Sequence, residues 1–330
     1  ALLVLAVFLI CFRMTRDRWV ALACVILVNA NDIFRHAIPY ATNHDMASLL
    51  TLAAFAFAVQ FDSKTRPVIS TVACGILVGL AIGTKLTFAL VPLCFLLPIV
   101  AVFGLSGRGL NSLLLFAGGL LAGLLPAAYI CARAGIDSTI FNNVGYHQLN
   151  AIWRAQSGFD HPMTLPEKFY FARRQLLDFS SALLLIAAAA LVVLRMRTGF
   201  PVSVKREPAV FAFVLFVPVC VAMFLIPTPI WRAYLSPFIV SVVLFTAALY
   251  SELTPGVRRP ARLALWAFAL AIVAMNIRGD AERFGVTFKP SQWMGEEIHR
   301  RGRIVRAAVP EEKMGRPVAT LSPVYALEAG

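Results

Sequence analysis

Charged residues are scarce in this chain of 330 amino acids. They make up 14% of the sequence, against about 25% in soluble domains, and 59% of the residues are hydrophobic. A water-soluble domain needs a polar surface, and this composition supplies too little of one. The shortage excludes a soluble bundle of buried helices and favours an integral membrane protein.

Cysteine pairs with metal-binding or redox spacing are also missing. The six cysteines form no C-x-x-C motif, and all of them lie in or beside apolar segments: Cys11, Cys24, Cys74, Cys94, Cys131 and Cys220. Because free cysteine packs as a small hydrophobic residue, we expect buried thiols, with neither a disulfide framework nor a thiolate metal site.

Apolar segments organise the chain instead. Ten of them are long enough, or nearly long enough, to cross a hydrocarbon layer about 30 Å thick: residues 1–12, 19–34, 47–61, 68–84, 86–103, 113–132, 179–194, 209–226, 234–250 and 263–277. Backbone amides in lipid must bond internally, and the alternation typical of barrel strands is missing. The expected fold is an all-α, polytopic transmembrane helix bundle.

Basic residues divide unevenly between the two sides of this bundle. Thirteen lie in the connections on one side: Arg13, Arg16, Arg18, Lys64, Arg66, Arg108, Arg195, Arg197, Lys205, Arg206, Arg258, Arg259 and Arg262. The short connections on the other side hold three, Arg35, Lys85 and Arg232. The positive-inside rule places the first set in the cytoplasm, so the net charge of +13 indicates topology rather than nucleic-acid binding. The tail from Arg278 carries nine Lys or Arg, but long segments translocate largely regardless of charge.

Three regions are then expected outside the cytoplasmic (inner) membrane: residues 31–46, 133–178 and the tail. Within the second, residues 165–177 predict an interfacial helix. Its basic side chains, Lys168, Arg173 and Arg174, either anchor the loop at the headgroups or form one wall of a lipid-phosphate site.

The expected domains are a bundle over residues 1–277 and the start of a soluble C-terminal α/β domain over 278–330. The tail pattern predicts a helix that ends at Gly302, then a strand and turn over residues 316–327. Because the chain begins without Met and stops after ALEAG, we expect a fragment open at both ends.

Asp45 and His44 begin a long apolar run in HAIPYATNHDMASLL. Thr42 and Asp45 form the T-x-x-D pattern of a capping box, and a carboxylate in the first turn suits the helix dipole. The functional alternative is a carboxylate that binds a substrate hydroxyl or a metal, with His44 as an added donor. Both interpretations are compatible.

Lys85 lies between two apolar runs in GLAIGTKLTFALVP. Charge at membrane depth is costly and therefore suggests function, and phosphate is the natural ligand of a lone ammonium. The alternative is a tight turn at the outer surface with a snorkelling lysine stem.

Two further outer segments carry candidates. In YHQLNAIWR, Arg154 is suited to clamp a phosphate and His147 to donate a hydrogen bond or act as acid or base; an ordinary amphipathic helix is the alternative. In PTPIWRAY, two prolines force a short outer connection that carries Arg232. No spacing matches a metal site, so we predict no cofactor, although a divalent metal is not excluded.

One acid and several cations thus face one side. This combination suits a lipid-linked phosphosugar: the cations hold phosphate as a leaving group, and the carboxylate orients or deprotonates an acceptor hydroxyl. An apolar bundle offers a groove for a polyprenyl tail.

The runs ATNHDMASLLTLAAFAFAVQ and GILVGLAIGTKLTFALVP resemble integral-membrane GT-C glycosyltransferases, more narrowly the bacterial relatives of protein O-mannosyltransferases and aminoarabinose transferases. The motif positions are Asp45, Gly79, Leu80, Gly83 and Lys85, then Arg232, Tyr234 and Pro237 in WRAYLSPFIV, over about residues 30–250. The resemblance implies inverting transfer of a sugar from a polyprenyl-phosphate donor to a lipid, glycan or protein acceptor on the non-cytoplasmic face. It also implies a principal catalytic acid in an outer loop ahead of Ala1, a supporting role for Asp45 and an inactive fragment.

Two alternative functions make different predictions. A multi-span transporter or lipid flippase predicts charges near the midplane and repeat symmetry, and the sequence shows neither. A membrane scaffold whose tail binds a partner leaves the outer polar cluster without a purpose.

Overall fold

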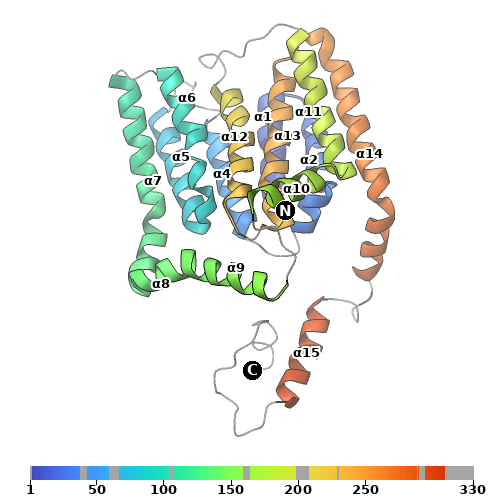
Figure 1. Ribbon diagram of the computed structural model, residues 1–330. Helices are drawn as coiled ribbons and strands as arrows, with labels where there is room; N and C mark the ends of the chain where they lie inside the picture. Colours follow the sequence, from blue (N-terminus) through green and yellow to red (C-terminus); the bar gives the residue numbers. More distant parts are fainter. Residues whose placement is uncertain are drawn as a thin grey trace. The chain divides into compact units, whose positions relative to one another are not determined.

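The computed structural model describes residues 2–37, 43–58, 67–103, 107–158, 164–197, 208–228, 230–287, 289 and 294–308 (Figure 1). The chain divides into two compact units, Ala1–Val273 and Ala274–Gly330. Within the described ranges every regular element is a helix, which confirms the all-α prediction for this part of the chain.

Helices α1 to α9 occupy the first half of the chain. Their bounds, with two short helical turns labelled η, are α1 Leu2–Thr15, α2 Arg18–Asn29, α3 Asp32–Ala37, α4 Asn43–Ala58, α5 Pro67–Thr84, η2 Leu86–Leu90, α6 Leu93–Phe103, α7 Gly107–Ala134, α8 Ile136–Ile140, η3 Phe141–Gly145 and α9 Tyr146–Gln156. The second half contains α10 Leu165–Leu176, α11 Phe179–Arg197, α12 Pro208–Leu225, η4 Arg232–Leu235, α13 Ser236–Ser251, α14 Pro255–Thr287 and α15 Met294–Ala308.

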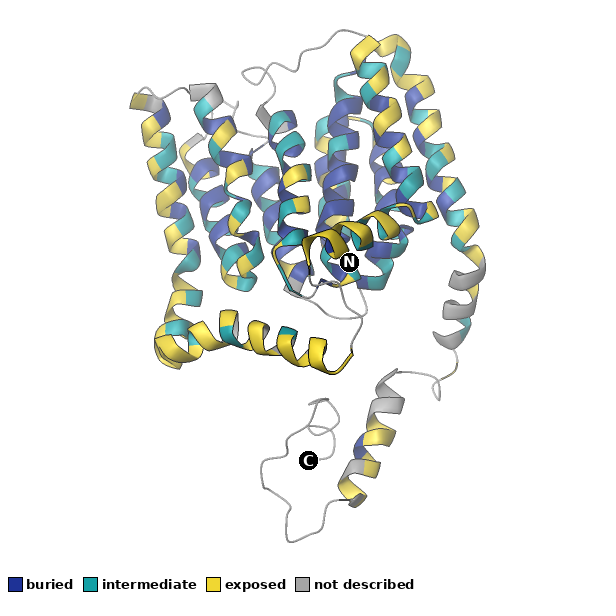
Figure 2. Ribbon diagram, in the orientation of Figure 1, coloured by how far each residue is buried: buried dark blue, intermediate teal, exposed yellow. Residues whose placement is uncertain are grey.

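Helix α13 lies at the centre of the first unit. Almost every residue from Ser236 to Tyr250 is buried, and Figure 2 shows this helix in dark blue along its length. Helices α1, α2, α11 and α12 pack against it. Burial on all sides explains why its sequence is apolar all round.

Helices α5 and α7 pack very closely against each other. A Cβ atom on Gly79 would overlap the Leu120 carbonyl oxygen, and one on Gly123 would overlap the Ile76 carbonyl oxygen. The two backbones therefore touch directly, as small residues permit in membrane helices. Gly79, one of the residues that carried the family resemblance, thus has a packing role.

Among the described residues, four helices are long and apolar enough to cross a membrane: Gly109–Ala134, Phe179–Arg197, Arg232–Ser251 and Pro255–Ile277. Six shorter apolar helices accompany them: Leu2–Thr15, Arg18–Asn29, His44–Ala58, Val68–Thr84, Leu86–Val100 and Val210–Leu225. Together these helices define a multi-pass integral membrane protein. That all ten cross the membrane stays a prediction.

Two boundaries differ from the predictions. The apolar segment 19–34 is not one helix, because Asn31 ends the run and caps the separate helix α3. The tail helix α15 continues through Gly302 to Ala308; glycine inside a helix costs only about 1 kcal/mol, and good helix formers surround it here. The strand predicted over 316–327 lies outside the described residues.

The cysteines follow the prediction of buried thiols. Five of the six are buried, and Cys131 is half-buried.

Candidate functional site

Lys85 occupies a break between two helices. Helix α5 ends at Thr84, Lys85 is extended with φ −153° and ψ 113°, and η2 begins at Leu86. The Lys85 N–H donates to the Ala81 carbonyl at 2.9 Å, and the Lys85 carbonyl accepts from the Phe88 N–H at 3.0 Å. The backbone at the break is therefore satisfied without the side chain, which leaves the ammonium free to interact elsewhere.

His44 is the partner of that ammonium. It lies in the first turn of α4, is only 3% exposed, and places its Nε2 2.6 Å from the Lys85 Nζ. A protonated lysine can only donate, so His44 accepts through Nε2 and carries its proton on Nδ1. Among the described residues this buried Nδ1 has no hydrogen-bond partner. An unpaired buried N–H is costly, so this nitrogen can donate a hydrogen bond to a further group.

The Tyr234 ring covers both side chains. Its centroid lies 4.7 Å from the Lys85 Nζ and 4.7 Å from the His44 ring centroid. A cation above an aromatic face is stabilised by the ring quadrupole, which partly offsets the burial of Lys85. Tyr234 belongs to η4, the short turn that leads into α13.

Arg232, two residues earlier in η4, forms an ion pair with Asp32 of α3. The Arg232 side chain is 25% exposed and that of Asp32 33% exposed. The Arg232 Nε is buried and has no hydrogen-bond partner among the described residues. We call the five residues Asp32, His44, Lys85, Arg232 and Tyr234 the Lys85 cluster, since η4 joins the two contacts.

Three polar side chains position α3 and Asp32. The Asn31 Oδ1 accepts from the Ile33 N–H at 3.0 Å, and the Asn31 Nδ2 donates to the Ser181 Oγ at 3.2 Å. The Asp32 N–H donates to the Ser180 Oγ at 3.1 Å. The start of α11 therefore fixes the helix that carries the carboxylate.

Sequence reasoning missed Asp32, although it identified the outer segment that contains it. The signal was present: Asn-Asp directly after an apolar run is a typical helix-capping pair, and a second acid in the segment offered a partner for Arg232.

Burial lowers the pKa of Lys85 to about 8. The ammonium remains the main form at neutral pH. Since none of the described carboxylates forms an ion pair with it, the cluster contains a cation suited to an anionic ligand.

Asp45 lies in the first turn of α4, as predicted for a residue that complements the helix dipole. It is half-buried and points about 100° around the helix from His44. No described residue forms an ion pair with it. Its predicted contact with substrate stays a prediction, and Thr42 of the proposed capping box lies outside the described residues.

Helix α9 carries the other predicted phosphate ligands, His147 and Arg154. Their side chains lie outside the described part of the structure, so the assignment of both residues stays a prediction. Tyr146 and Trp153 on the same helix are exposed. The predicted helix over 165–177 is confirmed as α10.

Lys168 of α10 does not face the headgroups, contrary to the prediction. It is 5% exposed, and its Nζ donates to the Leu225 carbonyl at 2.9 Å and to the Thr228 Oγ1 at 2.8 Å. An amine on the last carbonyls of a helix is favourable, so Lys168 caps α12 and holds the segment that leads to Arg232.

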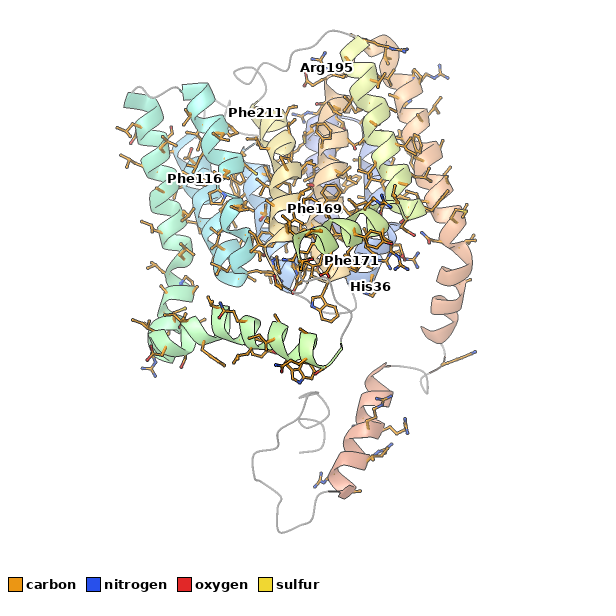
Figure 3. The ribbon with its side chains drawn as sticks, viewed as in Figure 1. His36, Phe116, Phe169, Phe171, Arg195 and Phe211 are labelled. Carbon is orange, nitrogen blue, oxygen red and sulfur yellow. The ribbon has the colours of Figure 1, made fainter. Side chains whose placement is uncertain are left out.

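The bundle ends that carry His36 and Arg195 are opposite (Figure 3). Figure 3 shows His36, on the helix that carries Asp32, at the other end of the bundle from Arg195. Within the described residues, no three His, Cys, Asp or Glu side chains gather as metal ligands.

This arrangement, a partly buried cluster of two cations at one end of a helix bundle, belongs to a multi-pass membrane protein. The family model for dolichyl-phosphate-mannose-protein mannosyltransferases matches residues 1–149. The predicted resemblance to membrane glycosyltransferases of the protein O-mannosyltransferase type is thus confirmed over this part of the chain. The resemblance was predicted over about residues 30–250, whereas the match starts at residue 1 and ends at residue 149. It includes Asp32, His44 and Lys85. No curated protein and no solved structure matched the chain.

Proposed function

We propose that this protein is a membrane glycosyltransferase that moves a sugar from a polyprenyl-phosphate donor to an acceptor hydroxyl on the non-cytoplasmic face of the cytoplasmic membrane. The observation that carries the proposal is the Lys85–His44 contact beneath Tyr234, joined through η4 to the Asp32–Arg232 pair. The family match supports the class of reaction and, by its description, a phosphate-linked mannose donor and a protein acceptor.

Lys85 and Arg232 bind the donor phosphate in this proposal. The ammonium supplies charge, the guanidinium two parallel donors, and the His44 Nδ1–H a third contact. These groups stabilise the negative charge that develops on the phosphate oxygen as the sugar leaves, so they favour the transition state. The polyprenyl chain stays in the hydrocarbon.

The transfer itself needs a proton acceptor. The acceptor oxygen attacks the anomeric carbon, the carbon–oxygen bond to phosphate breaks with its electron pair on phosphate, and the hydroxyl proton passes to a carboxylate. Attack from the face opposite the phosphate inverts the anomeric centre. Asp45 supports this step by orienting the acceptor. When Arg232 turns from Asp32 to the phosphate, the ion pair breaks and the Asp32 carboxylate becomes available as a proton acceptor.

The outer loop completes the proposed site. His147 and Arg154 on α9 provide further contacts to the donor, and α10 stabilises the connection that carries Arg232 through Lys168. The two basic side chains supply the positive charge that a metal provides in other phosphate sites, and we propose that the reaction needs no cofactor.

The test measures sugar transfer from a synthetic polyprenyl-phosphate mannose by the purified full-length enzyme in proteoliposomes. Lys85→Ala is expected to lower kcat/KM by about 100-fold or more, and Asp45→Asn by about tenfold. Lys289→Ala, at an exposed lysine of the second unit, is the control and retains wild-type transfer.

Full transfer by both Lys85→Ala and Asp45→Asn would remove these residues from the site. Uptake of the donor without transfer to any acceptor would favour a transporter. Loss of activity in EDTA, restored by a divalent cation, would contradict the metal-free mechanism.

A further inference from the structure

A cavity of about 440 Å³ lies at the opposite end of α2 and α13 from the Lys85 cluster. Two connections build it, the one between α1 and α2 and the one between α13 and α14. Its polar lining comprises Thr15, Arg16, Asp17, Arg18, Tyr250, Arg258 and Arg262. We call it the Asp17 pocket. The proposed transfer reaction does not use it.

Asp17 is part of the wall of this pocket rather than an open ligand. Its Oδ1 accepts from the Trp19 N–H at 2.9 Å, and its Oδ2 accepts from the Tyr250 hydroxyl at 3.2 Å and from the Arg262 Nη1 at 3.1 Å. Burial opposes ionisation, but the backbone hydrogen bonds and Arg262 outweigh it and lower the pKa of Asp17. The carboxylate therefore stays charged and neutralises one arginine.

The other three arginines leave the pocket with a net positive charge. Arg258 donates through Nη2 to the Ser251 carbonyl at 2.8 Å and through Nε to the Leu253 carbonyl at 2.9 Å, which fixes the guanidinium without cancelling its charge. Arg18 lies over the Trp19 ring, 5.3 Å from its centroid. These contacts hold the cations in place around a cavity that contains one carboxylate.

Arg16 has the only positive φ among the described non-glycine residues, at 54°. This conformation is uncommon for a residue with a Cβ, and strained backbone concentrates at functional sites. It turns the chain from α1 into α2 within two residues, so that Arg16 and Arg18 both line the cavity.

Apolar surface adjoins the charged lining. Phe12 lines the cavity and is 38% exposed, and Trp19 beside it is 48% exposed. Leu9 on α1 and Leu263 on α14 are exposed as well. A ligand that satisfies both surfaces has an anionic head and an apolar tail, and basic pockets at membrane helix ends bind such lipids.

We propose that the Asp17 pocket binds the phosphate group of an anionic phospholipid, with its acyl chains against α1 and α14. The pocket lies at the end of the bundle that carries most of the basic connections, where anionic headgroups are expected. Lipid bound there links the α1–α2 and α13–α14 connections and stabilises the helices whose opposite ends carry Asp32 and Arg232.

The experiment follows thermal unfolding of the purified full chain in detergent during titration with dioleoyl phosphatidylglycerol. Phosphatidylcholine and soluble glycerol phosphate form the other two arms. Phosphatidylglycerol is expected to raise the Tm of the wild-type protein, while the other two leave it unchanged. The double variant Arg16→Gln/Arg18→Gln is expected to weaken phosphatidylglycerol binding by about tenfold or more.

Arg13→Gln/Arg259→Gln is the matched control, because it removes two exposed arginines from the same end that do not line the cavity. It is expected to bind phosphatidylglycerol within about twofold of wild type. Equal weakening by both double variants would assign the effect to general surface charge and overturn the site. A Tm shift with glycerol phosphate alone would overturn the assignment to a lipid. If the double variant does not fold, Arg18→Gln against Arg13→Gln decides the same question.

Discussion

The two ends of α2 and α13 carry aspartate–arginine pairs that are held in different ways. At one end Asp17 accepts four hydrogen bonds, from two backbone N–H groups, a tyrosine and an arginine. At the other end the described partner of the Asp32 carboxylate is Arg232. The 12 residues of α2 separate the two aspartates by about 18 Å.

The difference indicates which pair is able to exchange partners. A carboxylate with four donors stays where it is, and its arginine is structural. A carboxylate with one cation releases it when a stronger anion arrives. Lys85, half-buried against a neutral histidine and an aromatic ring, supplies a second positive charge for a bound anion at the Asp32 end. We therefore expect chemistry at the Lys85 cluster and static binding at the Asp17 pocket.

The comparison is tested most strongly by removing one arginine at each end. Arg232→Met is expected to lower transfer by about 100-fold or more, because it removes a donor to the developing phosphate charge. Arg262→Met, at the Asp17 end, is expected to change transfer by less than about threefold per folded molecule. Transfer from a polyprenyl-phosphate mannose, normalised to the folded fraction, measures both.

A comparable loss in the two arginine variants would contradict the division of roles. Arg232→Lys sharpens the result, since it keeps the charge and loses the bidentate geometry. It is expected to recover only part of the activity.

Helix packing gives the next largest effect. Gly79→Ala forces a Cβ against the Leu120 carbonyl oxygen of α7, and overpacking of this kind typically costs about 1–3 kcal/mol. Because Lys85 follows α5, this change is expected to lower both the Tm and transfer, whereas phosphatidylglycerol binding at the Asp17 pocket is retained. Gly118→Ala on α7 is the control, since a Cβ there meets nothing within 4 Å. A Gly79→Ala protein as stable as the Gly118→Ala protein would refute the close α5–α7 contact.

Much of the fold was predictable because lipid leaves few choices. Every predicted apolar segment contains a helix in the structure, since a chain in hydrocarbon must satisfy its own backbone. The failures lie where polar groups decide the boundary. Asn31 divides one apolar run because it caps a new helix. Helix α15 continues through Gly302 because no capping group or proline among its described residues ends it there.

The sequence predicted most residues of the candidate site but not which of them contact each other. Lys85, His44, Arg232 and Tyr234 were all named from the sequence, yet the predicted acid was Asp45, and Asp32 was missed. Asp32 and Arg232 are 200 positions apart, so only the packing of α3 on η4 shows that they meet. Lys168 was predicted at the headgroups because its sequence pattern is amphipathic; its contact with the end of α12 depends on a helix 57 positions away.

The pH dependence of transfer is expected to come from the Lys85 cluster and not from the Asp17 pocket, and its effect is smaller. Lys85 must be protonated to bind phosphate, and its pKa is about 8. Transfer is therefore expected to fall about tenfold between pH 7 and pH 9. Lys85→Arg, which stays charged, is expected to flatten this decline at a lower maximum. An unchanged decline in that variant would exclude Lys85 as the titrating group.

The contribution of Lys85 to the free energy of unfolding changes with pH in the opposite direction to transfer. Its pKa falls from 10.5 in the unfolded chain to about 8 in the folded protein. Between these values the unfolded chain binds more protons, so the free energy of unfolding from this group rises with pH from about 8 to 10.5 while transfer falls.

Asp17→Asn is expected to have the smallest effect, because asparagine preserves the cap of α2 and only the charge toward Arg262 is lost. The expected loss of unfolding free energy is about 0.5–1 kcal/mol at neutral pH, with transfer unchanged. The folded-state pKa of Asp17 is lowered, so its contribution is complete above the unfolded value and disappears as pH falls through the folded value. Wild-type and variant stabilities should therefore converge in acid, and chemical unfolding from pH 7 down to pH 3 measures this convergence. Equal stability of the two proteins at pH 7 would show that the Asp17–Arg262 pair contributes nothing, and a loss of transfer would show that this end also takes part in the reaction.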